Sequence, residues 1–323
     1  MEIEISVVVP TFQRPQLLIN CLRHLCRQTL ERKKYEIIVV SDGPDILAKQ
    51  IVAEYRTCSS LNIKFLSLQA KKGPAAARNL GWRNAHGVLI AFTDDDCLPD
   101  KRWLESILNH YNNEQEIAYT GKVIVPVSEH PTDFELNTKG LETGDFVTAN
   151  CVCTRATLQV IDGFDEAFTE AWREDSDLEF KLLNRNVPIV KLSDAIVIHP
   201  VRKAAWGVSI KEQRKAMFNA LLFKKYPDLF RKRIRKSPTW KYYFIILFFM
   251  VLAVSVFLKI TFLVVIAFVG WLYLTVTFIV RRLIPARKTF SHIFEMIATS
   301  VVIPFLSVFW TIYGAIKYRV LFF

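Results

Sequence analysis

Three adjacent carboxylates follow an apolar run in the segment 88–97, which reads VLIAFTDDDC. Asp94, Asp95 and Asp96 repel one another unless a cation lies among them. Alternate residues of an extended or turning backbone project the same way, so Asp94 and Asp96 can converge on one hard ion while Asp95 points elsewhere. The triplet therefore predicts an acid-x-acid metal clamp. The competing interpretation is a solvated acidic turn before a helix that begins near Lys101.

The elements that position this triplet are expected to form an α/β sheet. Apolar runs at residues 5–9, 36–40, 63–68 and 88–93 alternate with stretches of helical periodicity, a pattern typical of parallel strands joined by right-handed crossovers. The turns at Thr11, Asp42 and Asp94 each follow one of these strands. We therefore expect all three at one edge of the sheet, where ligands of open α/β sheets bind.

Later in the chain the pattern is looser. Strands are expected near residues 118–127, 146–154 and 189–198, and the polar stretch 128–144 between the first two is expected to be mobile. The last strand ends at His199. A helix that opens near residue 173 carries acids in its first turn, where the helix dipole favours them.

Hydrophobicity is concentrated in the last third of the 323 residues, although the whole chain has a mean hydropathy of +0.22. Residues 1–230 are expected to form a globular domain and residues 231–323 a membrane domain, with helices at about 240–258, 260–280 and 293–316. The third apolar segment contains Glu295 and Pro304. It could span the bilayer or lie at its surface.

The net charge of +11 comes largely from basic residues that flank the apolar segments. These residues are Arg231, Lys232, Arg233, Arg235, Lys236 and Lys241 before the first segment, and Arg281, Arg282, Arg287 and Lys288 after the second. Such flanks are typical of cytosolic loops that face anionic lipid, so the charge predicts membrane lipids as partners and no nucleic acid. We expect a multi-pass protein of the plasma or inner membrane with a cytosolic catalytic domain.

Cysteine usage and the N-terminus agree with a cytosolic domain. The six cysteines are scattered without paired CxxC spacing, as expected for buried thiols in a reducing compartment. The first apolar run, residues 3–9, is too short for a signal peptide.

The turns argue against two classes of nucleotide-binding protein, the dehydrogenases and the P-loop NTPases. PTFQR follows the first strand in place of a glycine-rich dinucleotide fingerprint, and KKGPAAARN is not a phosphate-cradling GxxxxGK[ST] loop. What remains is an acid able to grip a base or ribose, Asp42, a cation for phosphates, Arg78, and the metal clamp. This set suits a nucleoside diphosphate.

Six short motifs in a fixed order carry a family resemblance. They are the strand into PTFQR, then SDGP, GPAAARNLG, TDDD, GFDE and REDSDLEFKL, and they extend over about residues 3–200. The chain resembles family 2 glycosyltransferases of the GT-A fold, a Rossmann-like mixed sheet, with C-terminal transmembrane helices.

The resemblance implies the donor site. Residues that would bind the nucleotide-sugar are Pro10, Thr11, Arg14, Asp42, Arg78, Asp94 and Asp95. Asp96 would ligate Mg²⁺ or Mn²⁺ bridging the diphosphate, and His199 matches a position that completes the metal site in some GT-A enzymes. A structural role for His199 stays open. Whether Asp94 and Asp96 or Asp95 and Asp96 form the working pair also stays open.

The resemblance further implies that Asp175, in a Glu-Asp pair, is the base that deprotonates the acceptor hydroxyl in a single inverting displacement. Repulsion from its neighbours Glu174 and Asp177 could raise the proton affinity of Asp175. Alternatively, either neighbour could be a helix-capping acid. Gln213-Arg214-Lys215 replaces the Gln-x-x-Arg-Trp of processive synthases, which argues against a secreting channel.

The expected function is a membrane-anchored, metal-dependent inverting glycosyltransferase. The expected donor is a UDP- or GDP-sugar and the expected acceptor a glycolipid or polyprenyl-linked saccharide. Two alternatives stay open: a polyprenyl-phosphate sugar transferase, and a membrane scaffold that binds a nucleotide-sugar without turnover.

Overall fold

The computed structural model describes residues 3–322 and divides the chain into two compact units. Unit 1 comprises Met1–Pro126 and Lys139–Val201, and unit 2 comprises Val127–Thr138 and Arg202–Phe323. Residues 202–230, which the sequence assigns to the globular domain, form short helices that pack within unit 2. The domain boundary near residue 230 stays a prediction.

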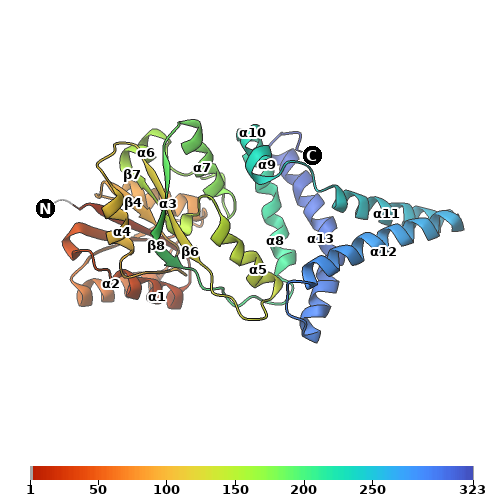
Figure 1. The fold of residues 1–323 in the computed structure, drawn as a ribbon, viewed down its shortest axis with the longest axis horizontal. Coiled ribbons are helices and arrows are strands. Elements are labelled where there is room, and N and C mark those ends of the chain that lie inside the picture. The colour runs from red at the N-terminus through yellow and green to blue at the C-terminus, as the bar shows by residue number, and fades with distance from the viewer. Residues whose placement is uncertain (1–2, 323) are drawn as a thin grey trace. The chain divides into compact units, whose positions relative to one another are not determined.

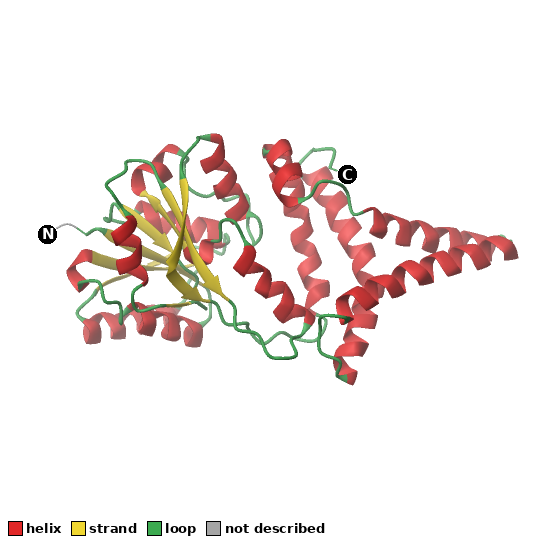
Figure 2. Cartoon of the chain, in the orientation of Figure 1, coloured by secondary structure: helices red, strands yellow, loops and turns green. Residues whose placement is uncertain are grey.

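Unit 1 is built on one mixed eight-stranded sheet in the order β3-β2-β1-β4-β7-β6-β8-β5 (Figure 2). The strands are β1 (Ile5–Thr11), β2 (Tyr35–Ser41), β3 (Asn62–Ser67), β4 (Leu89–Phe92), β5 (Leu98–Pro99), β6 (Ala118–Ile124), β7 (Cys151–Thr154) and β8 (Ile189–Ile198). The first four strands are parallel, as their alternation with helices predicts. β7 is antiparallel to β4 and β6, and β5 is antiparallel to β8, so the mixed GT-A type of sheet is confirmed.

Each face of the sheet is covered by helices because alternate strand residues point to opposite sides. Val7 and Val9 of β1 belong to one apolar core and Val8 to the other. The first core is completed by α1 (Pro15–Leu25), α2 (Ile46–Ser59) and α4 (Trp103–His110). The second is completed by α3 (Pro74–Arg83), α6 (Arg155–Val160) and α7 (Glu174–Asn184). Figure 1 shows α1 and α2 on the side of the sheet opposite α6 and α7.

Small residues bring α3 close to the sheet. Ala75, Ala76 and Ala77 are buried, and a Cβ atom on Gly81 would lie 2.4 Å from Cγ1 of Val8. Pro74 occupies the first turn, where its missing N–H leaves no helical hydrogen bond unmade. The close approach holds the N-terminal turns of α3 at the carboxyl edge of β1 and β4.

Three short helical segments lie among the loops of unit 1. They are η1 (Arg32–Lys34), η2 (Gly140–Thr143) and η3 (Thr148–Asn150). The stretch expected to be mobile contains α5 (Asp133–Lys139) and η2, and the strand expected at 146–154 is extended only from Cys151.

Unit 2 is helical among its described residues. Its elements after residue 202 are α8 (Val208–Glu212), η4 (Gln213–Ala216), α9 (Met217–Lys225), α10 (Pro227–Leu229), η5 (Phe230–Ile234), α11 (Trp240–Phe257), α12 (Thr261–Leu283) and α13 (Phe290–Lys317). The last three contain 18, 23 and 28 residues and are long and apolar enough to cross a membrane. They correspond to the three helices expected from the sequence. α11 and α12 form a hairpin, turned at Lys259 with a φ of 57°.

Polar contacts hold the start of α5 against the C-terminal helices within unit 2. Arg282 donates to both carboxylate oxygens of Asp133, at 3.3 and 2.8 Å, and to the hydroxyls of Thr299 and Ser300. Arg287 N donates to Pro131 O at 2.7 Å. A buried guanidinium needs such a set of acceptors, so Arg282 is fully committed inside this unit.

Candidate active site

The aspartate triplet forms a tight turn directly after β4. Cys97 N donates to Asp94 O at 3.1 Å, which closes the turn, and Cys21 Sγ lies 3.5 Å from the same carbonyl oxygen. The three side chains have different partners. Their roles can therefore be separated by their contacts.

Asp95 is held by the last residue of β1 and by the loop that follows this strand. Thr11 Oγ1 donates to Asp95 Oδ2 at 2.8 Å, and Arg14 Nη1 lies 3.3 Å from Oδ1. Only 2% of Asp95 is exposed. Burial raises its pKa to about 6 against the effect of Arg14, and Asp96 adds to the rise. Both oxygens of Asp95 thus have partners at the end of β1 or in the loop after it. Thr11 and Arg14 share this one carboxylate as their partner.

Asp94 faces Arg78, which the first turns of α3 bring to the strand end. Arg78 Nη2 donates to Asp94 Oδ1 at 2.7 Å, while Nη1 donates to Glu174 Oε1 at 3.1 Å. Burial of the guanidinium opposes its charge, but Asp94 and Glu174 together raise the pKa of Arg78 above its ordinary value. In the same way Arg78 outweighs burial and lowers the pKa of Asp94. Arg78 therefore links the end of β4 to the start of α7.

Four potential metal-binding side chains meet beside this link. One donor atom from each of Asp94, Asp96, Cys97 and His199 lies within 4.8 Å of the other three. His199 follows β8, and its Nε2 is 3.5 Å from Asp96 Oδ1. The buried Nδ1 of His199 has no hydrogen-bond partner among the described residues.

The donor set of this cluster fits Mg²⁺ or Mn²⁺. Two carboxylates with an imidazole offer the hard donors that these ions take, and the imidazole suits Mn²⁺ better. Burial raises the pKa of Cys97 well above its usual range, which keeps this thiol protonated and makes it a poor ligand. The cluster contains Asp94 and Asp96 but not Asp95, in line with the alternation expected along an extended or turning backbone.

Asp42 stands at the end of β2 with its carboxylate tied to the next turn. It accepts hydrogen bonds from the backbone N–H of Lys72 at 2.7 Å and of Gly73 at 2.9 and 3.0 Å. Gly73 has a φ of 104°, and a Cβ there would lie 2.4 Å from the carbonyl oxygen of Thr169. Asp42 thereby fixes the basic turn before α3. Pro10, the remaining residue expected in the nucleotide pocket, lies buried in β1 opposite Val40.

Asp175 lies in the first turn of α7 and is half-buried. Its Oδ1 accepts from Ser176 N at 2.6 Å and from Ser176 Oγ at 3.3 Å. The preceding residue, Glu174, is buried, and burial raises its pKa to about 7 against the effect of Arg78. Because Glu174 binds Arg78, the next residue, Asp175, lies close to the contact between Arg78 and Glu174.

Two contacts of the site were not foreseen from the sequence. Arg78 lies over the ring of Phe164, 5.5 Å from its centroid, and Asn79 donates to Phe164 O at 2.9 Å while accepting from Phe164 N at 3.0 Å. The GFDE turn therefore positions α3. Glu174 was interpreted only as a neighbour of Asp175 or a capping acid. The signal that could have revealed its pairing is Arg78 itself, because a buried guanidinium between apolar residues requires acids.

Comparison with known proteins finds a family model and several relatives that match part of the chain. Residues 6–150 match the sequence model described as glycosyl transferase family 2. The glycosyltransferase AglE of Haloferax volcanii is 34% identical over 101 residues, which cover 31% of this chain and 33% of that protein. Validoxylamine A glucosyltransferase of Streptomyces hygroscopicus subsp. jinggangensis is 26% identical over 282 residues, which cover 73% of this chain and 61% of that protein. The chain thus spans from a third to about three-fifths of the length of these relatives.

Solved structures share the fold. S. aureus TarS 1-349 in complex with UDP superposes with a TM-score of 0.52 at 21% identity, covering 73% of this chain and 74% of that one. The mannosyltransferase PcManGT from Pyrobaculum calidifontis, in complex with GDP-Man and Mn²⁺, has a TM-score of 0.57 at 15% identity and covers 99% of this chain and 88% of that one. At these identities the likeness establishes the fold alone.

Proposed function

We propose that this chain, whose residues 6–150 match the glycosyl transferase family 2 model, is a membrane-anchored, metal-dependent glycosyltransferase. It would move a sugar, with inversion, from a nucleotide-sugar to an acceptor held at the membrane. The observation that carries this proposal is the meeting of Asp94, Asp96 and His199 donor atoms within 4.8 Å at the carboxyl end of the sheet. Two carboxylates and an imidazole at that edge suit a cation that binds a diphosphate.

The residues of unit 1 have separable roles in this proposal. Asp96 and His199, with Asp94, would hold Mg²⁺ or Mn²⁺, which when bound stabilises negative charge on the leaving diphosphate. Arg78 keeps Asp94 ionised and oriented through their 2.7 Å contact. Asp42, Pro10 and the loop bearing Thr11 and Arg14 border the nucleotide, and Asp95 holds that loop in place.

Asp175 is the proposed general base. Its carboxylate is oriented by the Ser176 N–H at 2.6 Å and is half-buried at the start of α7. An acceptor hydroxyl that loses its proton to Asp175 becomes the nucleophile at the anomeric carbon, and the proton stays on the carboxylate. Glu174 supports this position by anchoring the helix start to Arg78.

Relatives support the class of donor. TarS structures contain UDP or UDP-GlcNAc, and the PcManGT structure contains GDP-Man with Mn²⁺. We therefore propose a UDP- or GDP-sugar here.

The acceptor is proposed from the C-terminal helices. α11, α12 and α13 are long and apolar enough to cross a bilayer, and basic residues flank them on the side assigned to the cytosol. A catalytic unit tethered in this way meets glycolipids or polyprenyl-linked saccharides at high local concentration. We propose a multi-pass protein of the plasma or inner membrane with unit 1 in the cytosol.

The test is sugar transfer by the purified full chain to a membrane-lipid extract, with radiolabelled UDP- and GDP-sugars and Mn²⁺. We expect label in the lipid fraction, lost on addition of EDTA and in Asp96→Asn. If the chain binds nucleotide-sugars but releases no nucleotide from any donor, it is the non-catalytic scaffold and not an enzyme.

A further inference from the structure

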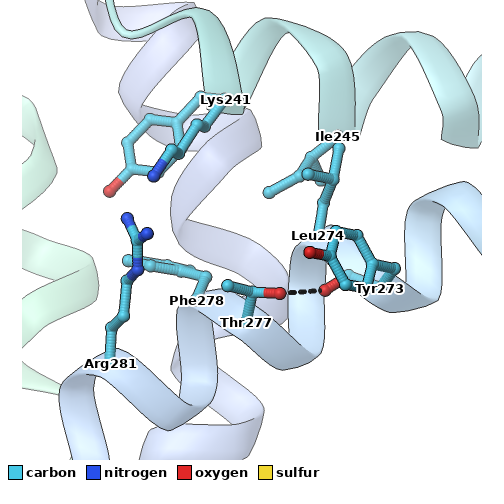
Figure 3. Close-up of a pocket in the computed structure, with 8 residues that line it drawn as sticks. Lys241, Ile245, Tyr273, Leu274, Thr277, Phe278 and Arg281 are labelled. Carbon is cyan, nitrogen blue, oxygen red and sulfur yellow. Dashed lines mark hydrogen bonds between the residues drawn. The ribbon is translucent and has the colours of Figure 1, made fainter.

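A cavity in unit 2 lies between α11 and α12 and is not part of the site described above. Its volume is about 280 Å³, and its walls include Lys241, Tyr242, Ile245, Leu274, Phe278 and Arg281. Figure 3 shows Lys241 and Arg281 with their cationic ends toward the same end of this cavity, while Ile245 and Leu274 lie at the other. The cavity therefore has a charged end and an apolar end.

The two cations of the cavity differ from the neighbouring Arg282 in their partners. Arg282 is neutralised by Asp133 at 2.8 Å and bonded to Thr299 and Ser300. Neither Lys241 nor Arg281 has an ion-pair partner in the part of the chain that the structure describes, and both are exposed. No acid lines the cavity. Two cations facing one cavity favour an anion between them.

The position of the cavity along α11 and α12 indicates which kind of anion binds there. Lys241 lies in the first turn of α11 and Arg281 in the last turn of α12, so both stand at the same end of the hairpin. If α11 and α12 span the membrane as proposed, this end is at the cytosolic headgroup level and Ile245 and Leu274 face the acyl chains. The further inference rests on that part of the proposed function.

We infer that the cavity binds an anionic membrane phospholipid. Its phosphate lies between Lys241 and Arg281, and the beginning of one acyl chain lies against Ile245, Leu274 and Phe278. A volume of about 280 Å³ accommodates the phosphate and the first methylenes, and the rest of the chain continues into the bilayer. The lipid joins the ends of α11 and α12 by charge as well as by apolar contact.

The test measures thermal unfolding of the purified full chain in a neutral detergent while short-chain phosphatidylglycerol is added. Phosphatidylcholine, a polyprenyl phosphate and inorganic phosphate are titrated in parallel. We expect a saturable rise of Tm with phosphatidylglycerol, a weaker effect of phosphatidylcholine and none of inorganic phosphate. In Lys241→Gln/Arg281→Gln the half-saturating concentration should rise about thirtyfold, because each cation near a lipid surface contributes about a factor of five.

Two further variants keep the inference falsifiable. Lys236→Gln/Arg287→Gln removes the same charge outside the cavity and should behave as the wild type. Leu274→Trp fills the apolar end, keeps both cations, and should abolish the saturable rise. An equal loss in the outside variant, equal stabilisation by inorganic phosphate, or stabilisation by a polyprenyl phosphate but not by phosphatidylglycerol would overturn the inference.

Membrane anchoring is measured separately by extraction of membranes with alkaline carbonate. A chain that resists extraction but shows no saturable lipid effect contradicts the lipid site alone. A chain that is extracted contradicts the proposed anchoring, and the lipid site with it.

Discussion

The hydroxyl of Thr11 donates to Asp95 Oδ2 at 2.8 Å, across 84 residues of sequence. Together with Arg14 at 3.3 Å, it binds the middle acid of the triplet to the loop after β1. The other two acids lie with His199 in the proposed metal cluster. The triplet thus combines a loop anchor with a cation site, and the two functions are separable by mutation.

Asp96→Asn should weaken Mn²⁺ binding by about a hundredfold or more, since even groups outside the first coordination shell of metals are worth ten- to a hundredfold. The isosteric Asp95→Asn should weaken it by less than about tenfold, because the Thr11 hydrogen bond can persist. Calorimetric titration of Mn²⁺ into the full chain measures both. The reverse ranking would show that Asp95 and Asp96 form the working pair.

Asp175→Asn should lower kcat by about 10²- to 10⁴-fold, the usual contribution of a general base, and leave the KM for the donor nearly unchanged. The Ser176 N–H contact can persist with the amide oxygen, so Tm should change little. Steady-state transfer rates and a thermal scan check this prediction. A variant that keeps most of its rate would instead favour a lipid phosphate as acceptor, because a phosphate hardly needs a base.

The pH dependence of stability should report the burial of Glu174. Its pKa is about 7 in the folded chain against an ordinary value of 4.5, so the folded state retains a proton that the unfolded state has lost between these values. The contribution of Glu174 to the free energy of unfolding therefore falls as pH rises from 4.5 to 7. Glu174→Gln, compared with the wild type by denaturant titration, should gain relative stability across this interval. A difference that does not vary with pH would contradict the assignment.

Glu36 offers a stability test far from the carboxyl edge of the sheet. Its buried carboxylate accepts from Ser6 Oγ at 2.7 Å, Lys64 Nζ at 2.8 Å and His86 N at 2.6 Å. Burial alone would raise its pKa, but these donors lower it below 4.5. Glu36→Gln should cost roughly 2 kcal/mol near pH 7, as expected when a buried charge-assisted hydrogen bond is weakened.

The sign of that pH dependence is opposite to that of Glu174. Because the pKa of Glu36 is lowered in the folded state, its ionised carboxylate stabilises the fold above pH 4.5. This contribution to the free energy of unfolding is lost as pH falls through the pKa of the folded state. The difference in the free energy of unfolding between the wild type and Glu36→Gln should therefore become smaller below pH 4.5. The exposed Glu31, paired with Lys33 at 2.7 Å, serves as a control, and Glu31→Gln should leave the unfolding curve unchanged. Equal effects of both substitutions would argue against a specific role for the buried network.

The parallel half of the sheet was predictable because β1, β2 and β4 are fully buried and read as nearly continuous apolar runs. β5 was not, since two residues, Leu98 and Pro99, carry no periodic signal. The 3₁₀ turn η4 between α8 and α9 was not predictable either, because apolar spacing does not distinguish a 3₁₀ turn from an α-helical one.

At the site, sequence spacing indicated that Asp94 and Asp96 can converge but left the working pair open. It could not show the pairing of Arg78 with Glu174, 96 residues away. Contacts of that kind depend on how α3 and α7 pack against the sheet. The same limit applies to the Asn79 clamp on the GFDE turn. Local chemistry was therefore readable in the sequence, whereas the side chains that orient it were not.

The central claim is that Asp94, Asp96 and His199 hold a cation that binds a nucleoside diphosphate. Its most direct test is the thermal stability of the full chain with UDP, GDP and their sugars, each with and without Mn²⁺, because a ligand that binds the folded state raises Tm. We predict stabilisation by at least one of these nucleotides that requires Mn²⁺ and disappears in Asp96→Asn. Stabilisation by none of them, or stabilisation independent of both Mn²⁺ and Asp96, would contradict the account.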